Sequence, residues 1–234
     1  MFIHNWKVAL LSICGLLACA AVSQQVRRPK DTWGRINIVN HWLARVVQIK
    51  CRVTLPGTEV RQYSAGSATL VKTKSGIYAM TNRHVVEHFV VVRADQCRMT
   101  YRGTDFVAGS DQIVLFDNPS IDIAFVRILE SVALESLFKR GNGFCKYMPE
   151  QGDPVYLFGH PFAVKDTLVT EGIVAGYHED DILVTATMDM GSSGGAAVDA
   201  RHGCYFGAPN AVIKGKAAAF GNVIPITSIP VGKP

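Results

Sequence analysis

One serine of this sequence lies in a glycine-rich stretch that could place it next to groups able to polarise a carbonyl. Ser193 belongs to residues 190–196, Met-Gly-Ser-Ser-Gly-Gly-Ala. Glycine reaches positive φ at little cost, so this stretch can form a tight turn whose N–H groups face one point. Such N–H groups could hold a developing oxyanion beside a serine hydroxyl. Taken alone, the stretch is more typical of a surface turn, because glycine and serine dominate turns.

A serine nucleophile also needs a base and a carboxylate that orients the base. His84 is the candidate base, since it closely follows a strand-like stretch at residues 77–81. Asp122 is the candidate orienting group, because it lies between two isoleucines, where a buried carboxylate is costly unless it is paired. Taken alone, His84 is more typical of an ordinary loop or core histidine, and Asp122 could equally cap a turn.

A competing zinc motif overlaps the candidate base. His84, Glu87 and His88 form an H-x-x-E-H pattern, and on a helix the two histidines would share a face that could bind zinc. That motif needs a long helix and a further ligand from another helix, whereas strand-like stretches flank this segment. We therefore expect no metal or other cofactor, and we expect Glu87 and His88 to face solvent after a single turn.

The composition indicates a globular protein that can bury a sizeable core. The chain has 234 residues, of which 48% are hydrophobic and 18% charged, with a net charge of +5. Its one tight basic cluster is Arg27, Arg28 and Lys30. No basic stripe interleaved with aromatic residues accompanies this cluster, so a solvated linker is favoured over a surface that binds nucleic acid.

The N-terminus is typical of an export signal. Lys7 precedes an apolar run, 8–22, which is shorter than the roughly 20 residues that span a bilayer. Two processing sites compete: small residues at 21–23 suit a signal peptidase, and Leu16-Leu17-Ala18-Cys19 resembles a lipobox, which would attach a lipidated Cys19 to a membrane. An uncleaved anchor is a third option. All three place the folded part outside the cytoplasm, in the periplasm or the extracellular space.

Residues 44–128 contain six strand-like stretches that are rich in β-branched residues and separated by turn signals. Regular spacing of short strands predicts a small barrel or sandwich. The expected strands are 44–53, 59–71 with a bend or bulge at Gly66, 77–81, 89–93 with an extension toward 101, one strand within 106–116, and 121–128.

A second six-strand unit follows a connection that has a helix-compatible pattern at 132–140, and the serine turn lies inside this unit. We therefore predict an all-β protein of two six-stranded antiparallel β-barrels. The strands expected in the second unit are 155–159, 167–177, 181–187, 196–198, 204–213 and 217–226. The expected segments are a leader 1–23 (ending at 18 for a lipoprotein), a tether 24–41, a first barrel 42–130, a connection 131–150 and a second barrel 151–234.

Four cysteines beyond the leader, Cys51, Cys97, Cys145 and Cys204, suggest two disulfides in an oxidising compartment. If each disulfide stays within one unit, the pairs are Cys51–Cys97 and Cys145–Cys204. The other two connectivities and four buried free thiols stay open as alternatives.

The order of the three candidates, His84 and Asp122 in the first unit and Ser193 in the second, resembles that of the chymotrypsin-fold (trypsin-like) serine proteases. Further segments resemble the HtrA/Deg branch of this family, and the resemblance spans roughly residues 42–230. These segments are Thr81-Asn82-Arg83-His84-Val85-Val86 (T-N-x-H-V-V in the branch), Asp122-Ile123-Ala124 (D-[IL]-A), residues 152–162 (G-D-x-V-x-x-x-G-x-P-F), Gly172-Ile173-Val174, residues 191–196 (G-N-S-G-G-A) and the closing strand 220–226.

The resemblance implies an exported serine endopeptidase with its active site between the two barrels, acting on protein or peptide substrates in quality control or processing. Ser193 would be the nucleophile, His84 the general base and then acid, and Asp122 the group that orients His84. The N–H groups of Gly191 and Ser193 would form the oxyanion hole. Ser192 stands where the branch usually has Asn, a change that we expect the turn to tolerate.

Departures from the relatives inform regulation and specificity. Ser192 replaces the Asp of the digestive zymogens and no I-V-G-G start is present, so their activating salt bridge is not expected. Thr187, six residues before the nucleophile, lies at the base of the specificity pocket in this fold and is not acidic, which favours a small or medium apolar P1 residue over Lys or Arg. The chain ends at Pro234, so we expect a member without a PDZ domain, and its oligomeric state stays open.

Two functions of other kinds also fit the sequence. The chain could be a non-catalytic or latent binding module with a protease fold, or a viral or phage processing protease of the same fold.

Overall fold

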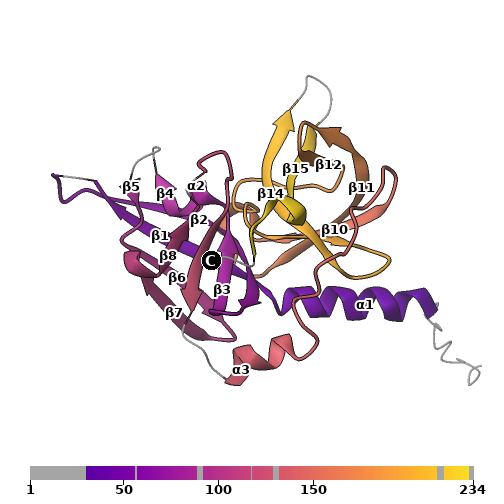
Figure 1. Ribbon diagram of the computed structural model, residues 1–234, viewed down its shortest axis with the longest axis horizontal. Coiled ribbons are helices and arrows are strands. Elements are labelled where there is room, and N and C mark those ends of the chain that lie inside the picture. Colours follow the sequence, from indigo (N-terminus) through magenta and orange to yellow (C-terminus); the bar gives the residue numbers. More distant parts are fainter. Residues whose placement is uncertain are drawn as a thin grey trace, which may run out of the picture.

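Figure 1 shows the computed structural model, which describes residues 30–55, 57–88, 92–116, 118–128, 132–214 and 219–231. The expected leader, with the candidate lipidation site Cys19, lies outside these residues. Within the part of the chain that is described, no helix has both the length and the apolar character needed to cross a membrane.

The first unit is a curled antiparallel sheet rather than the six-stranded barrel that we expected. Its seven strands follow the order β7-β6-β1-β2-β3-β9-β8, and among the described residues the two outer strands are not hydrogen-bonded to each other. The stretch 106–116 holds two strands instead of one, because the short 3-10 helix η1 (Ser110–Gln112) separates them. The strands are β1 (Val46–Thr54), β2 (Arg61–Thr73), β3 (Gly76–Thr81), β6 (Gln96–Tyr101), β7 (Thr104–Gly109), β8 (Ile113–Leu115) and β9 (Ala124–Ile128), with a small hairpin of β4 (Glu87–His88) and β5 (Val92–Arg93) beside them.

The second unit is the predicted closed six-stranded barrel, and the order of its strands is β10-β11-β12-β15-β14-β13. Alternation along β10 shows how it is built: Val155 and Leu157 point into the barrel core, whereas Tyr156 and Phe158 pack toward the first unit. The strands are β10 (Pro154–Gly159), β11 (Leu168–His178), β12 (Asp181–Val184), β13 (Ala196–Asp199), β14 (Tyr205–Lys214) and β15 (Ala219–Pro225). The connection contains α3 (Val132–Glu135) and the 3-10 helix η2 (Ser136–Phe138).

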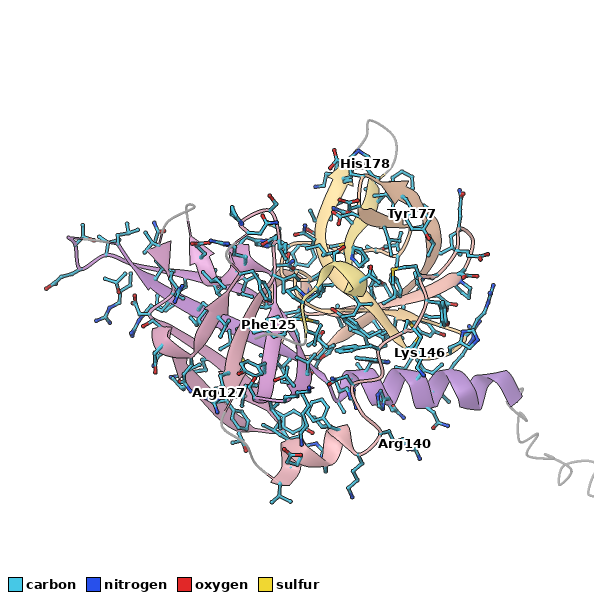
Figure 2. All side chains as sticks on the ribbon, viewed as in Figure 1. Phe125, Arg127, Arg140, Lys146, Tyr177 and His178 are labelled. Atoms are coloured by element: carbon cyan, nitrogen blue, oxygen red, sulfur yellow. A yellow bond between two sulfur atoms is a disulfide. The ribbon has the colours of Figure 1, made fainter. Side chains whose placement is uncertain are left out.

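A third apolar core lies between the two units and fixes their relative position. It combines Phe125 of the first sheet with Phe158 and Tyr205 of the second barrel, all of them fully buried. Figure 2 shows Phe125 near the middle of the molecule, whereas Tyr177 and His178 lie at the far end of the second barrel.

Most of the expected tether is a helix, which corrects the prediction for residues 24–41. Helix α1 (Lys30–Leu43) lies along the second barrel (Figure 1), and the remaining tether residues precede the described part. Trp42 at its end is 1% exposed, and its indole Nε1 donates a hydrogen bond to the Gly203 carbonyl at 2.9 Å. The stretch is therefore ordered by a contact with a residue far along the chain, which its polar composition could not reveal.

The two predicted within-unit disulfides are confirmed. Cys51 and Cys97 face each other across β1 and β6, and their Cα atoms are 4.1 Å apart. Cys145 and Cys204 join the connection to the residue before β14, with a Cα separation of 4.9 Å.

Gly66 does not form the bulge that we expected. The pairing of β1 with β2 runs through Ile49 and Gly66 without a shift in register. A side chain at Gly66 would instead collide with a neighbour, since its Cβ would lie 2.8 Å from Val85 Cγ2 and 3.2 Å from the Ser193 carbonyl oxygen. Glycine is needed here because the serine turn and the segment after β3 both approach the strand closely.

A buried cation joins the start of β1 to the connection between the units. Arg45 is 1% exposed, and its guanidinium donates to the carbonyls of Leu137, Gly141 (2.9 Å) and Asn142 (2.5 Å). It also lies 5.0 Å from the ring centre of Phe138. Burial lowers the pKa of Arg45 to about 10, so the side chain is still charged at neutral pH.

Replacing this arginine should destabilise the fold strongly. Arg45→Met leaves three carbonyls without their donor, and we expect the free energy of unfolding to fall by about 3 kcal/mol. Arg35→Met is the matched control: Arg35 pairs with Glu171 at 3.4 Å, both side chains are about half exposed, and a change below about 1 kcal/mol is expected. Urea unfolding followed by circular dichroism measures both, and equal effects would contradict the proposed importance of Arg45.

Candidate active site

His84 and Asp122 meet because their strands are neighbours. β3 pairs with β9 so that Thr81 faces Ala124, and His84, three residues after β3, therefore lies at the same end of the sheet as Asp122, two residues before β9. One Asp122 oxygen accepts the backbone N–H of His84 at 2.9 Å, and the other lies 2.7 Å from the imidazole Nδ1. Asn82 adds a bond from its side-chain amide to the Asp122 carbonyl at 2.8 Å. This arrangement places the proton of neutral His84 on Nδ1 and leaves Nε2 as an acceptor.

The segment that carries His84 is a single helical turn, α2 (Arg83–Val86), followed by β4. Glu87 does not face solvent as we expected. Its side chain is 12% exposed and forms an ion pair with Arg83, a contact that raises the pKa of Arg83. The side chain of His88 lies outside the described residues. Because Glu87 is in a strand, the H-x-x-E-H pattern has no helical register here, and the described residues contain no cluster of potential metal ligands.

The serine turn connects β12 to β13, and two of its glycines have positive φ. Gly191 and Gly194 have φ values of 98° and 83°, in the left-handed region that side chains disfavour. Space forbids a side chain as well: a Cβ at 191 would lie 2.4 Å from the His160 carbonyl oxygen, and one at 194 would lie 2.3 Å from that of Ser67. The turn is therefore packed against backbone from both units.

All carbonyl groups of residues 190–193 accept hydrogen bonds. Phe162 N–H donates to the Met190 carbonyl at 2.7 Å, and Gly195 N–H donates to that of Ser192 at 3.1 Å. Ser67 supplies the other two bonds: its hydroxyl donates to the Gly191 carbonyl at 2.6 Å, and its N–H donates to the Ser193 carbonyl at 2.8 Å. These bonds fix the orientation of each peptide unit.

Two N–H groups of the turn are left without an acceptor. The N–H groups of Ser192 and Gly194 donate to the carbonyls of Asp189 and Pro209, both at 2.9 Å. Within the described part of the chain, neither Gly191 N–H nor Ser193 N–H donates a hydrogen bond. The C=O and N–H of a trans peptide point in opposite directions, so these two N–H groups point away from Phe162 and Gly195. The turn thus presents two free donors on either side of Ser192.

The Ser193 hydroxyl is bonded to a main-chain carbonyl rather than to His84. It donates to the Asn210 carbonyl at 2.9 Å, where β14 has a register shift between Pro209 and Ala211. Among the described residues, Ser193 and His84 are not hydrogen-bonded to each other. The structure therefore joins His84 directly to Asp122, while the Ser193 backbone is bonded to Ser67, the residue after Gly66.

A small, mostly apolar cavity of about 20 Å³ adjoins the turn, and Thr187 is part of its wall. Its lining contains no charged residue: Leu157, Phe158, Gly159, Pro161, Leu168, Thr170, Thr187, Ser192 and Pro209. A volume of this size admits roughly one or two water-sized groups. The cavity therefore suits a small apolar side chain, and its wall contains no carboxylate that would attract a cation.

Several residues around the turn were missed by sequence reasoning. Ser67 and Asn210 contact it from β2 and β14, and Phe162 and Ala163 beside it have unusual φ values of 54° and 55°. His160 is 3% exposed, its ring nitrogens lie 3.1 Å from the Val164 carbonyl and the Thr167 hydroxyl, and its burial lowers its pKa. Two features of the sequence could have indicated these residues: Gly66, which precedes Ser67, and the G-x-P-F pattern around Phe162.

Comparisons with known proteins agree with this geometry. Residues 66–207 match the family described as "Trypsin-like peptidase domain". The structure of the "HtrA-type protease AlgW with decapeptide" is similar, with a TM-score of 0.62 and 25% identity, over 82% of this chain and 64% of that one. The serine endoprotease from Yersinia pestis is similar in fold, with a TM-score of 0.62 and 22% identity, over 82% of this chain and 62% of that one. This chain thus spans just under two thirds of the length of both. A search of curated proteins found no match.

The matched domain covers more than half of the chain and contains His84, Asp122 and Ser193. The two-unit β fold is shared with both solved structures, and the resemblance to the HtrA/Deg branch is confirmed by the first of them. On this evidence, the chain belongs to the trypsin-like peptidase family.

Proposed function

We propose that the protein is a serine endopeptidase that cleaves peptide bonds through an acyl-enzyme. The observation that carries this proposal is the pair of unpaired N–H groups, at Gly191 and Ser193, in a turn whose carbonyls are all bonded. A turn with only a structural role would gain by satisfying these donors. Donors held free beside a serine hydroxyl are what a developing oxyanion requires.

Each group of the site has a defined task in this reaction. Ser193 Oγ attacks the carbonyl carbon of the substrate, and His84 Nε2 takes the hydroxyl proton while Asp122 stabilises the imidazolium. The negative oxygen of the tetrahedral intermediate accepts from Gly191 N–H and Ser193 N–H. His84 then protonates the leaving amine, which departs. Water, deprotonated by His84, attacks the acyl-enzyme, and Ser193 regains its proton when the carboxylic acid product leaves.

Substrate backbone has a natural docking edge at β14. Beyond Pro209, β14 pairs only with β15 among the described strands, so its other edge is open. An extended peptide lying along that edge could donate an N–H to the Asn210 carbonyl. That carbonyl now accepts the Ser193 hydroxyl, so peptide binding would free the hydroxyl to turn toward His84. Catalytic hydrogen bonds often form only in the substrate complex.

The cavity beside Thr187 would hold the P1 side chain of the substrate. Its small volume and uncharged lining favour alanine, valine or another small apolar residue, and disfavour lysine and arginine. Export of the protein, through the leader at 1–23 or a lipidated Cys19, belongs to the same proposal. Two disulfides are compatible with an oxidising compartment outside the cytoplasm.

A fluorophosphonate probe tests the nucleophile. We expect the wild type to be labelled and Ser193→Ala to lose all labelling, because the probe phosphonylates an activated serine hydroxyl. Ser192→Ala is the neighbouring control and should keep labelling, which gel fluorescence measures. Labelling that survives Ser193→Ala but not Ser192→Ala would move the nucleophile by one residue, and an unlabelled wild type would favour a binding module or a latent form.

The identity of the P1 pocket is tested by enlarging it. Leu168 lines the cavity, so Leu168→Ala should raise kcat/KM for a peptide with leucine at P1, relative to alanine at P1, by about ten-fold. Val169→Ala alters the next residue of β11, whose side chain points to the opposite face, and should leave that ratio unchanged. Steady-state assays with matched peptides measure both ratios. An unchanged ratio in Leu168→Ala would show that the P1 side chain binds elsewhere.

A further inference from the structure

Ser67 of β2 is a fully buried serine of the first unit that contacts the serine turn of the second unit. Its N–H donates to the Ser193 carbonyl at 2.8 Å, and its hydroxyl donates to the Gly191 carbonyl at 2.6 Å. The same hydroxyl accepts the N–H of His160 at 2.8 Å. The Ser67 carbonyl accepts the Thr81 hydroxyl at 2.7 Å, which anchors the residue to the strand that leads to His84. Every polar group of Ser67 is thus engaged.

The direction of the Ser67 hydroxyl proton follows from these contacts. A hydroxyl has one proton to donate and two lone pairs that accept. His160 N–H is itself a donor, so it must use a lone pair of the oxygen. The proton is therefore left for the Gly191 carbonyl, and this bond holds the Gly191–Ser192 peptide unit at its carbonyl end. The N–H end of that unit is held by the Asp189 carbonyl at 2.9 Å.

The Gly191–Ser192 peptide group lies between the two peptide groups that carry the free N–H groups. The donor of Gly191 belongs to the preceding peptide and that of Ser193 to the following one. Rotation of the middle peptide would change ψ of Gly191 and φ of Ser192, and glycine offers little resistance to such a rotation. The Asp189 carbonyl restrains the middle peptide from within the turn at its N–H end, and the Ser67 hydroxyl restrains it from the first unit at its carbonyl end.

The same hydroxyl also holds the second segment that shapes the donors. Phe162 N–H fixes the Met190 carbonyl, and hence the direction of Gly191 N–H, from a residue whose φ of 54° is unfavourable. His160, two residues earlier, is bonded to Ser67 Oγ. One buried hydroxyl therefore bridges the segment around Phe162 and the serine turn.

We propose that Ser67 is a positioning residue for the oxyanion hole, acting from the first unit through the Gly191 carbonyl and His160 N–H. This inference rests on the proposed endopeptidase function of the site. Ser67 is not part of the cavity wall beside Thr187, so its hydroxyl should matter for the transition state rather than for substrate binding.

The test compares Ser67→Ala with the wild type in cleavage of a peptide that has a small apolar P1 residue. We expect kcat to fall about 10- to 100-fold, somewhat less than for loss of an oxyanion donor itself, with KM within about two-fold. A peptide aldehyde of the same sequence forms a tetrahedral adduct with the serine, so its affinity should weaken by the same factor as kcat. A residue needed only for folding would not produce this joint pattern.

Two further variants keep the test decisive. Ser67→Cys fills the space with a weak donor and should give an intermediate kcat, so it carries the comparison if Ser67→Ala does not fold. Ser136→Ala removes a serine hydroxyl that donates to the Ala133 carbonyl at 2.7 Å in the connection, and should leave kcat and aldehyde affinity unchanged. Circular dichroism melting checks that each variant is folded.

The outcomes separate this inference from the proposed function. If the wild type is active and labelled at Ser193 while folded Ser67→Ala keeps its kcat within about two-fold, the role of Ser67 is refuted and the endopeptidase stands. A raised KM at unchanged kcat would also refute it, because Ser67 would then act in substrate binding. A wild type that neither cleaves peptides nor reacts with the fluorophosphonate overturns the endopeptidase, and the role of Ser67 with it.

Discussion

The serine turn keeps its shape through hydrogen bonds that come from other segments. Glycine at 191 and 194 is required because neighbouring backbone would lie within 2.4 Å of a Cβ at either position. These glycines remove the restraint that side chains would give the turn. Most of the rigidity is supplied by donors outside the turn, because Ser67 and Phe162 supply three of the four bonds to the carbonyls of residues 190–193. The close approach that makes the turn possible also brings these donors within reach.

The hydrogen bonds from Ser67 form only if the two units keep one fixed position relative to each other. Apolar packing stabilises this position more than charged pairs do. Phe125 and Phe158 are fully buried in the core between the units, and such side chains contribute roughly 1.5–3 kcal/mol each. By comparison, the exposed ion pair of Arg35 with Glu171, which joins α1 to the second barrel, contributes at most about 1 kcal/mol. Buried Arg45 also fixes the position of the start of β1 relative to the connection, because its guanidinium donates to three carbonyls there.

Sequence reasoning predicted what depends on local pattern. Alternating strands gave the closed second barrel, and counting cysteines within units gave both disulfides. The predicted pairing of His84 with Asp122 is seen as a hydrogen bond, whereas the catalytic roles of these residues and of Ser193 stay predictions. Long-range contacts escaped prediction: α1 is ordered by a bond from Trp42 to Gly203, and Ser67 meets Gly191 across 124 positions of sequence. No local pattern encodes which distant backbone a small residue will touch.

The two free N–H groups show why the site needs both units. Buried or half-buried N–H groups normally find an acceptor, and a flexible turn would rotate until these did. Here each peptide that carries a free donor has its own carbonyl bonded, at Met190 by Phe162 and at Ser192 by Gly195. Rotation toward a protein acceptor would break one of these bonds for each one gained. Ser67 holds the middle peptide from the first unit. The donors therefore stay free partly because of a hydrogen bond that crosses the interface between the units. The second barrel alone does not contain this hydrogen bond.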